Sequence, residues 1–362
     1  MFELASKVEN PINLSIGQPD FPVPRPIKDA VIKAIEEDHN GYTVTKGDPH
    51  ILEFCEAHLR DNVGWSFGDE RLDMMMTSGT SGGLVLGAMA TLDEGDELII
   101  PDPWFVLYPK LGALTGARIV PCDTYPDFRM TADRIEPLLT ERTKAVLLAS
   151  PGNPTGVVLT EDEVRDLVEL CRARGILIIS DEIYDEFTFS DFMVDGRCPS
   201  PARFWDQVLL IRGLGKTYGC TGWRLGYAAG PSALIAQMAK LQQFTYVCAP
   251  SMAQHAFEAM GRVSITKEVD RYAARRDLIM QRLGGLAEIS RPGGAFYAFI
   301  EVPAHLGLTG TQFAEAALEH GLLVVPGAVF SDRDTHFRIS FAVPDDVLEQ
   351  GLRILELLLR SG

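Results

Sequence analysis

Four short polar segments of the sequence each directly follow an apolar, strand-like run. They are Ser78–Gly83, Ser150–Gly156, Asp181–Tyr184 and Gly213–Thr217. In an open parallel sheet, ligands bind beyond the carboxyl ends of the strands. We therefore expect the four segments to meet at one edge of a sheet.

Three of these segments carry groups that suit a phosphate-bearing aldehyde. Gly79, Thr80 and Ser81 begin a helix after a strand, and a helix N-terminus presents free N–H groups and a positive dipole end to a phosphate. Lys216, at a strand end and desolvated near cations, can lose its proton and attack an aldehyde. Asp181, at another strand end, can pair with a pyridinium nitrogen and strengthen that ring as an electron sink.

Three further polar residues complete the set. Tyr184 and Asn153 can hydrogen-bond the 3′ oxygen of a pyridine ring, and Arg224, eight residues after Lys216, can bind a phosphate through two N–H groups. Pyridoxal 5′-phosphate (PLP) combines a phosphate, an aldehyde and a pyridine ring. The pattern therefore predicts PLP as the cofactor, held by Lys216 as a Schiff base.

The same residues lie in segments that resemble the class I/II aminotransferases, aspartate aminotransferase-like members of the fold-type I PLP enzymes. Ser180–Tyr184 is similar to the family's SDEIY, Pro151–Gly156 to its NPTG, and Lys216–Tyr227 to its SK-T…GWRLGY stretch. The other matching segments are Gly17–Phe21, Pro292–Phe296 and Phe337–Phe341. The resemblance spans nearly the whole chain in order, so it is far more specific than any single motif.

The resemblance implies roles for five residues. Arg338 would clamp the α-carboxylate of the substrate, with the backbone of Gly17 closing over the substrate and Asn153 contacting it. Phe105 would stack on the pyridine ring. Tyr42 would reach the phosphate in the neighbouring subunit, which implies a homodimer with shared active sites.

The predicted reaction moves the amino group of an L-amino acid to a 2-oxo acid through a pyridoxamine phosphate intermediate. Lys216, displaced from the cofactor by the substrate, would act as general base at the α-carbon, and Asp181 would keep the ring nitrogen protonated. We count Tyr184 with these two as the catalytic residues. Relatives of the family also include carbon–sulfur lyases and cyclopropane-forming synthases, so a PLP lyase is an alternative on the same fold.

Two positions depart from the family's pattern. Gly213 stands three residues before the lysine, where the family usually has Ser or Thr that bonds the phosphate. Gly215 stands directly before the lysine, where Ser is usual. The expected consequence is one missing phosphate hydrogen bond, which lowers cofactor affinity or is replaced by another donor.

Two other classes of enzyme compete for these segments. Gly215-Lys216-Thr217 prompts a P-loop, but that motif requires Gly where Leu210 stands. Gly79–Gly83 fits the G-x-S-x-G of serine hydrolases, with Ser81 as nucleophile. That reading needs a histidine base downstream, and nothing singles out one of His255, His320 and His336. We keep the serine hydrolase as the alternative from another class.

The elements that position these residues follow from an alternation of apolar runs and amphipathic stretches. The runs that predict strands are Leu72–Thr77, Glu97–Ile100, Arg118–Pro121, Ala145–Ala149, Ile176–Ser180 and Val208–Arg212. Several are apolar throughout, as buried parallel strands are. Between two of them, Glu161–Arg174 is a clear helix, with Thr160 and Glu163 as a capping box and Gly175 at its end. The fold class is α/β, with a mostly parallel central sheet flanked by helices.

The pattern changes towards the C-terminus. Residues 27–253 are expected to form a large PLP-binding domain that begins with a helix at Ile27–Glu37, and residues 254–362 a smaller α+β domain joined by a proline-rich arm, residues 1–26. The expected C-terminal helices are Gln254–Met260, Glu268–Leu283, Thr311–Glu319 and Asp345–Leu359. The expected strands are Ala295–Glu301, Leu322–Val325 and His336–Phe341.

Composition limits the partners. The formal net charge of −17 and the absence of Lys/Arg runs argue against nucleic acid and anionic membranes. Six scattered cysteines without a C-x-x-C pair indicate reduced thiols in a cytoplasmic protein. We find no metal-binding motif, no signal-peptide core in the first ten residues and no apolar run long enough to span a membrane.

Overall fold

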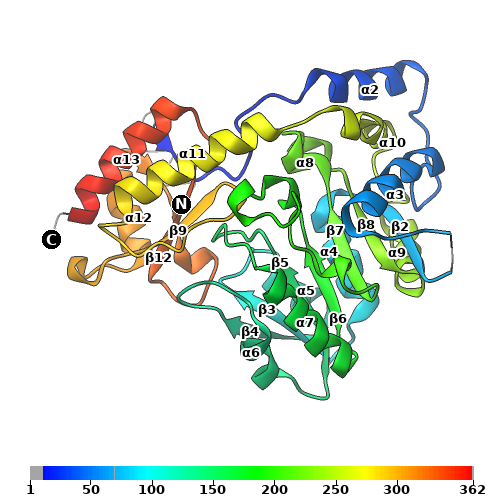
Figure 1. The fold of residues 1–362 in the computed structure, drawn as a ribbon, viewed down its shortest axis with the longest axis horizontal. Helices are drawn as coiled ribbons and strands as arrows, with labels where there is room; N and C mark the ends of the chain where they lie inside the picture. The colour runs from blue at the N-terminus through cyan, green and yellow to red at the C-terminus, as the bar shows by residue number, and fades with distance from the viewer. Residues whose placement is uncertain (1–10, 69, 361–362) are drawn as a thin grey trace.

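A twisted central sheet with helices on both faces lies beside a smaller group of strands and long helices (Figure 1). The structure, a computed structural model, describes residues 11–68 and 70–360. The first ten residues, for which the sequence indicates no signal peptide, lie outside the described part. No helix in the described part is long and apolar enough to cross a membrane.

Seven strands form the central sheet in the order β2-β8-β7-β6-β5-β3-β4. They are β2 (Leu72–Thr77), β3 (Glu97–Asp102), β4 (Arg118–Asp123), β5 (Thr143–Ala149), β6 (Leu177–Asp181), β7 (Val208–Arg212) and β8 (Gly226–Pro231). β8 runs antiparallel to both of its neighbours, and the other pairs are parallel. The predicted α/β fold with a mostly parallel sheet is confirmed.

All six strands predicted from apolar runs are present, with bounds that agree to within two residues. The seventh strand, β8, was missed because it carries two glycines, two alanines and a proline, which are poor strand formers. Its glycines are required by close packing. A Cβ on Gly226 would lie 2.9 Å from the carbonyl carbon of Gly79, and one on Gly230 would lie 2.6 Å from the backbone oxygen of Val208.

Helices cover the two faces of the sheet. α4 (Gly79–Thr91), α5 (Tyr108–Thr115) and α9 (Ser232–Thr245) pack on one face, around a core that includes Leu98 and Ile211. α3 (Pro49–Val63) and α7 (Glu161–Arg174) contribute to the larger core on the other face. This larger core continues without a break into the C-terminal part of the chain.

The helix α7 has the predicted bounds and the predicted caps. The Thr160 side chain accepts a hydrogen bond from the backbone N–H of Glu163, and the Glu163 carboxylate accepts one from the backbone N–H of Thr160. Gly175 ends the helix in the left-handed conformation, at φ 65°.

The C-terminal part contains a three-stranded antiparallel sheet in the order β11-β12-β9 and three longer helices. The strands are β9 (Tyr297–Glu301), β11 (Val325–Pro326) and β12 (His336–Ser340), and the helices are α11 (Thr266–Leu283), α12 (Gly310–Glu319) and α13 (Asp345–Arg360). The strand expected at Leu322–Val325 is divided. Its first half, β10 (Leu322–Leu323), pairs in parallel with β1 (Ile12–Asn13) of the N-terminal arm.

The helix expected at Gln254–Met260 is a short α10 (Ser251–Gln254) followed by a 3-10 helix, η6 (His255–Arg262). Both pack against α2 (Arg25–Glu36), and η6 also packs against α3. Figure 1 shows α2, α3 and α10 side by side at the same end of the molecule. The domain boundaries at residues 26 and 253 stay a prediction.

Candidate active site

A cavity of about 310 Å³ lies where the central strands end and the C-terminal part meets them. Eleven of the twelve site residues expected from the sequence line it, which confirms that the polar segments converge. They are Gly17, Gly79, Thr80, Ser81, Phe105, Asn153, Asp181, Tyr184, Lys216, Arg224 and Arg338. The twelfth, Tyr42, lies outside this cavity on the loop between α2 and α3, with 84% of its surface exposed.

One end of the cavity is built to bind an anion. Gly79, at φ +69°, starts α4. The side chain of the preceding Ser78 makes no capping hydrogen bond, so it leaves the N–H groups of the first turn free. A Cβ on Gly79 would lie only 2.7 Å from Nη2 of Arg224. The glycine therefore lets the Arg224 guanidinium approach the positive end of the helix, and an anion there would meet both.

The structure explains the unusual Gly213. A Cβ at this position would lie 3.0 Å from the backbone oxygen of Leu225 and 3.3 Å from the Cγ2 methyl of Thr80. A Ser or Thr here would require the backbone at Leu225 and Gly226, or Thr80, to shift by a few tenths of an ångström. Gly215 is different, because a Cβ there would make an ordinary contact of 3.4 Å with Thr221.

Lys216 lines the cavity from α8 (Leu214–Thr217), which follows β7. Its Nζ donates a hydrogen bond to the backbone oxygen of Gly17, which ties the N-terminal arm across the site. Burial lowers the pKa of Lys216 to about 8, and the positive charges of Arg338 and Arg224 add to this effect. About a tenth of this lysine is therefore the neutral, nucleophilic amine at pH 7, far more than for a lysine with the ordinary pKa.

Asp181 is the last residue of β6 and is 4% exposed. Burial raises the pKa of its carboxyl to about 6, although a hydrogen bond from Tyr108 opposes the shift. The Tyr108 hydroxyl lies 2.8 Å from Oδ2 of Asp181 and donates to it. A buried carboxylate in this state is stabilised by a cation, so the position fits a protonated ring nitrogen.

Two tyrosines that the sequence analysis missed line the cavity. Tyr108 fixes Asp181, and Tyr297 places its hydroxyl 2.9 Å from that of Tyr184. Tyr297 also explains Gly17, since a Cβ there would lie 2.6 Å from the Tyr297 hydroxyl. Tyr108 lies three residues after Phe105, and Tyr297 directly follows the segment Pro292–Phe296, but the partners of both tyrosines are far away in the sequence.

Arg338 reaches the cavity from β12. Its Nη1 donates to Oδ1 of Asn153 at 2.8 Å, and its Nη2 donates to the backbone oxygen of Ser15 at 2.8 Å. The guanidinium carbon lies 4.5 Å from the ring centre of Tyr297 and 4.8 Å from that of Phe330. Its Nε is buried and makes no hydrogen bond. A guanidinium held in place at the wall of the cavity suits a substrate carboxylate.

A comparison of the sequence with known protein families identifies the family to which the chain belongs. The family model for aminotransferase class I and II matches residues 9–355. The chain belongs to this family.

Individual aminotransferases resemble the chain over nearly its full length. An aspartate/prephenate aminotransferase of Cereibacter sphaeroides is 34% identical over 96% of this chain and 91% of its own. An aromatic-amino-acid aminotransferase of Thermococcus litoralis is 30% identical over 100% of this chain and 95% of its own. The solved aspartate aminotransferase of Thermotoga maritima is 30% identical, with a TM-score of 0.90, and the match covers 99% of this chain and 95% of its own.

Members of the class I and II family use PLP, so this chain is an enzyme that transfers amino groups with that cofactor. The residues fit the group: an anion site, a lysine with a lowered pKa and a buried carboxyl group line one cavity. Membership of this family replaces the two alternative interpretations, a P-loop protein and a serine hydrolase that uses Ser81. Ser81 lies in the first turn of α4, and no histidine is among the described residues that line the cavity.

Proposed function

We propose that this aminotransferase transfers the amino group of an L-amino acid to a 2-oxo acid with Lys216 as the residue that holds PLP. The observation that carries the proposal is the convergence of Lys216, Asp181 and Arg338 on one cavity. A nucleophilic amine, a partner for the ring cation and a clamp for a carboxylate are three separate requirements of transamination.

Each end of the cofactor has a matching group in the cavity. The first turn of α4, with Gly79, Thr80 and Ser81, and the Arg224 guanidinium would hold the phosphate. Phe105 would stack on the ring. Tyr184 and Asn153 would hydrogen-bond the 3′ oxygen of the ring. Asp181 would pair with the ring nitrogen.

PLP supplies an aldehyde that condenses with amines and a ring that withdraws electrons from the substrate's α-carbon. The chain supplies the rest. Lys216 would hold the aldehyde when no substrate is present and, once displaced, its neutral amine would accept the α-carbon proton on Nζ. Asp181, in its ionised form, would stabilise a protonated ring nitrogen, and Tyr108 holds Asp181 in place. Phe105 and the arm at Gly17 exclude water from the reacting atoms.

A panel of substrates tests the proposal. The absorption spectrum of the protein with PLP is recorded before and after addition of single L-amino acids, including aspartate and aromatic amino acids, because relatives carry those names. We expect a cofactor band that fades with an amino donor and returns with a 2-oxo acid. A band that persists while pyruvate or ammonia accumulates would instead identify a PLP lyase.

Replacement of Arg338 by alanine tests the carboxylate clamp. We expect the KM to rise about 10–100-fold for every amino donor, because a charged hydrogen-bonded contact contributes about 1.5–3 kcal/mol. Steady-state kinetics over several donors is the measurement. An increase restricted to some donors would place Arg338 at the substrate side chain and not at the α-carboxylate.

We also propose that the enzyme is a homodimer in which Tyr42 reaches the partner's site. Three large apolar side chains are strongly exposed on one part of the surface: Tyr42 (84%), Val44 (64%) and Phe244 (78%). The side chain of Gln242 in α9 donates to the backbone oxygen of Thr45 at 2.6 Å, so the end of α9 and this loop are neighbours. An exposed apolar patch of this kind favours association.

Hybrid dimers test the shared site. Lys216→Ala and Tyr42→Ala protomers are each expected to form dimers with a strongly reduced rate at limiting PLP. In a mixed dimer, one site combines both defects and the other is intact, so mixing and re-association should restore activity towards half of the wild-type value per dimer. Sedimentation of the protein as a monomer, or no recovery on mixing, would contradict the proposal.

A further inference from the structure

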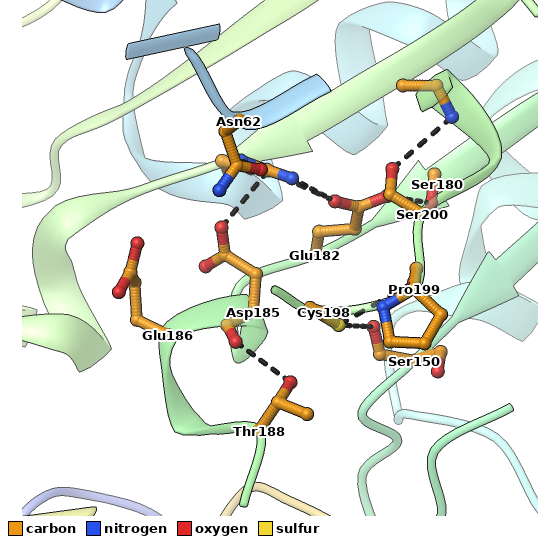
Figure 2. A network of polar contacts seen from close by, with 12 residues as sticks. Asn62, Ser150, Ser180, Glu182, Asp185, Glu186, Thr188, Cys198, Pro199 and Ser200 are labelled. Carbon is orange, nitrogen blue, oxygen red and sulfur yellow. Dashed lines mark hydrogen bonds and ion pairs between the residues drawn. The ribbon is translucent and has the colours of Figure 1, made fainter. Parts of the chain in front are cut away.

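A buried arginine lies behind the active site, at the end of β7 and four residues before Lys216. Arg212 is 2% exposed. Its Nε and Nη2 donate to Oε2 of Glu182 at 3.0 and 2.7 Å, and its Nε lies 3.1 Å from Oδ2 of Asp185. Its Nη1 donates to Oδ1 of Asn62 in α3 at 2.8 Å. Figure 2 shows Asn62, Asp185 and Glu182, the three residues that this guanidinium contacts.

Glu182 extends the network to further elements. Its Oε1 accepts hydrogen bonds from the hydroxyls of Ser180 at 2.8 Å and Ser200 at 2.7 Å. Its backbone N–H donates to the backbone oxygen of Ile211 at 2.9 Å. One carboxylate therefore joins β6, the segment before η4 (Pro201–Arg203) and, through Arg212, the end of β7 (Figure 2).

The network and the cavity share one short piece of backbone. Asp181 and Tyr184 line the cavity, whereas Glu182 and Asp185 bind Arg212. Both pairs lie within residues 181–185, so holding Glu182 and Asp185 also fixes the direction of Asp181 and Tyr184. Arg212 is also the last residue of β7, and the chain after it leads through Gly213 into α8, which carries Lys216.

Arg212 is the ionic centre of this region. Burial opposes its charge, but Asp185 and Glu182 raise the pKa of Arg212 well above its usual value. Among the described residues, the other titratable groups that interact with its charge are His58 from α3, Glu186, Cys198 and Tyr227. Removing a buried partner of two carboxylates leaves an uncompensated charge, so the strand ends would have to rearrange.

We propose that Arg212 is a positioning residue that sets Asp181 relative to Lys216 through its bonds to Glu182 and Asp185. The inference rests on the function proposed above, in which Lys216 and Asp181 act at different points of one cofactor. Arg212 itself does not line the active-site cavity. Its effect on the reaction is therefore carried by the backbone of residues 181–185 and 213–216.

Two substitutions separate positioning from plain stability. Arg212→Lys keeps the charge but loses the two-pronged contact with Glu182. Asn62→Ala removes one uncharged acceptor of the Arg212 guanidinium and gives a milder variant if the first does not fold. Arg276→Gln is the matched control, because Arg276 is also a buried arginine between two carboxylates, Asp191 and Asp277, away from the cavity.

The holoenzymes are compared by kcat, KM, melting temperature, apparent Kd for PLP and the pH midpoint of the cofactor's absorption band. We expect Arg212→Lys to lower kcat about 10–100-fold with KM changed less than about twofold, as a displacement of about 1 Å does. We also expect the pH midpoint to move by about half a unit or more, and smaller changes of the same kind in Asn62→Ala. Arg276→Gln is expected to lower only the melting temperature.

Two outcomes would contradict different claims. If the wild type shows the cofactor band and the Arg212→Lys and Asn62→Ala variants lose stability while keeping the wild-type midpoint and kcat, Arg212 is structural and the inference is wrong. If the wild type shows no cofactor band at all, the proposed function fails before the inference is reached.

Discussion

Replacing Lys216 by alanine is expected to lower kcat by at least about 10⁴-fold, since the variant loses both the nucleophile that holds the cofactor and the group that moves the proton. The structure gives the reason: Lys216 lines the cavity with a pKa lowered to about 8 by burial and by Arg338 and Arg224. The variant should still bind PLP through the phosphate contacts. Single-turnover kinetics with the best donor is the measurement.

The control for this experiment is Lys267→Ala. Lys267 is an exposed residue of α11 and does not line the cavity. This variant should keep wild-type kinetics. Turnover by Lys216→Ala within about tenfold of the wild type would be incompatible with general-base catalysis by this lysine.

Replacing Asp181 by asparagine is the second large effect that we expect. Asparagine keeps the shape and the hydrogen bond with Tyr108 but cannot balance a ring cation. The kcat should fall about 10²–10³-fold, the range found when an electrostatic contact to the reacting system is removed. A kcat close to that of the wild type, with a normal melting temperature, would show that the ring nitrogen does not depend on this carboxylate.

The pKa of Asp181 adds a pH dependence with a definite sign. Its folded-state pKa is raised from 3.8 to about 6 by burial, so its contribution to stability is fully present below about pH 4 and is lost as the pH rises through 6. A ring cation restores the loss by favouring the ionised form. PLP should therefore raise the melting temperature more at pH 7.5 than at pH 5. The part of this difference due to Asp181 should disappear in Asp181→Asn.

The sequence was most informative where a structural feature depends on residues that are close together in the chain. Strands that are buried in a sheet are rich in apolar residues, so β2 and β7 have the bounds expected from their apolar runs. The capping box and the terminal glycine of α7 are local chemistry, so that helix was also predicted accurately. Eight of the eleven predicted site residues that line the cavity end or follow strands of the central sheet, whose carboxyl ends lie at one edge. The other three, Gly17, Arg224 and Arg338, come from the N-terminal arm, from the segment before β8 and from β12.

The sequence was least informative where the signal is a contact between distant residues. Tyr108 binds Asp181 across 73 positions and Tyr297 binds Tyr184 across 113, and neither pairing leaves a local pattern. The Arg212 network has the same character, because Asn62 is 150 positions away. Strand β8 was missed for a different reason: tight packing selects its glycines against their strand propensity.

The measurement that tests the central claim most directly is borohydride reduction of the wild-type holoenzyme followed by peptide mapping. Reduction makes the bond between a lysine and the cofactor permanent, so the labelled peptide identifies the lysine. The account predicts one label per chain, on the peptide that contains Lys216. A label on any other lysine, or a protein that binds PLP without becoming labelled, would contradict it.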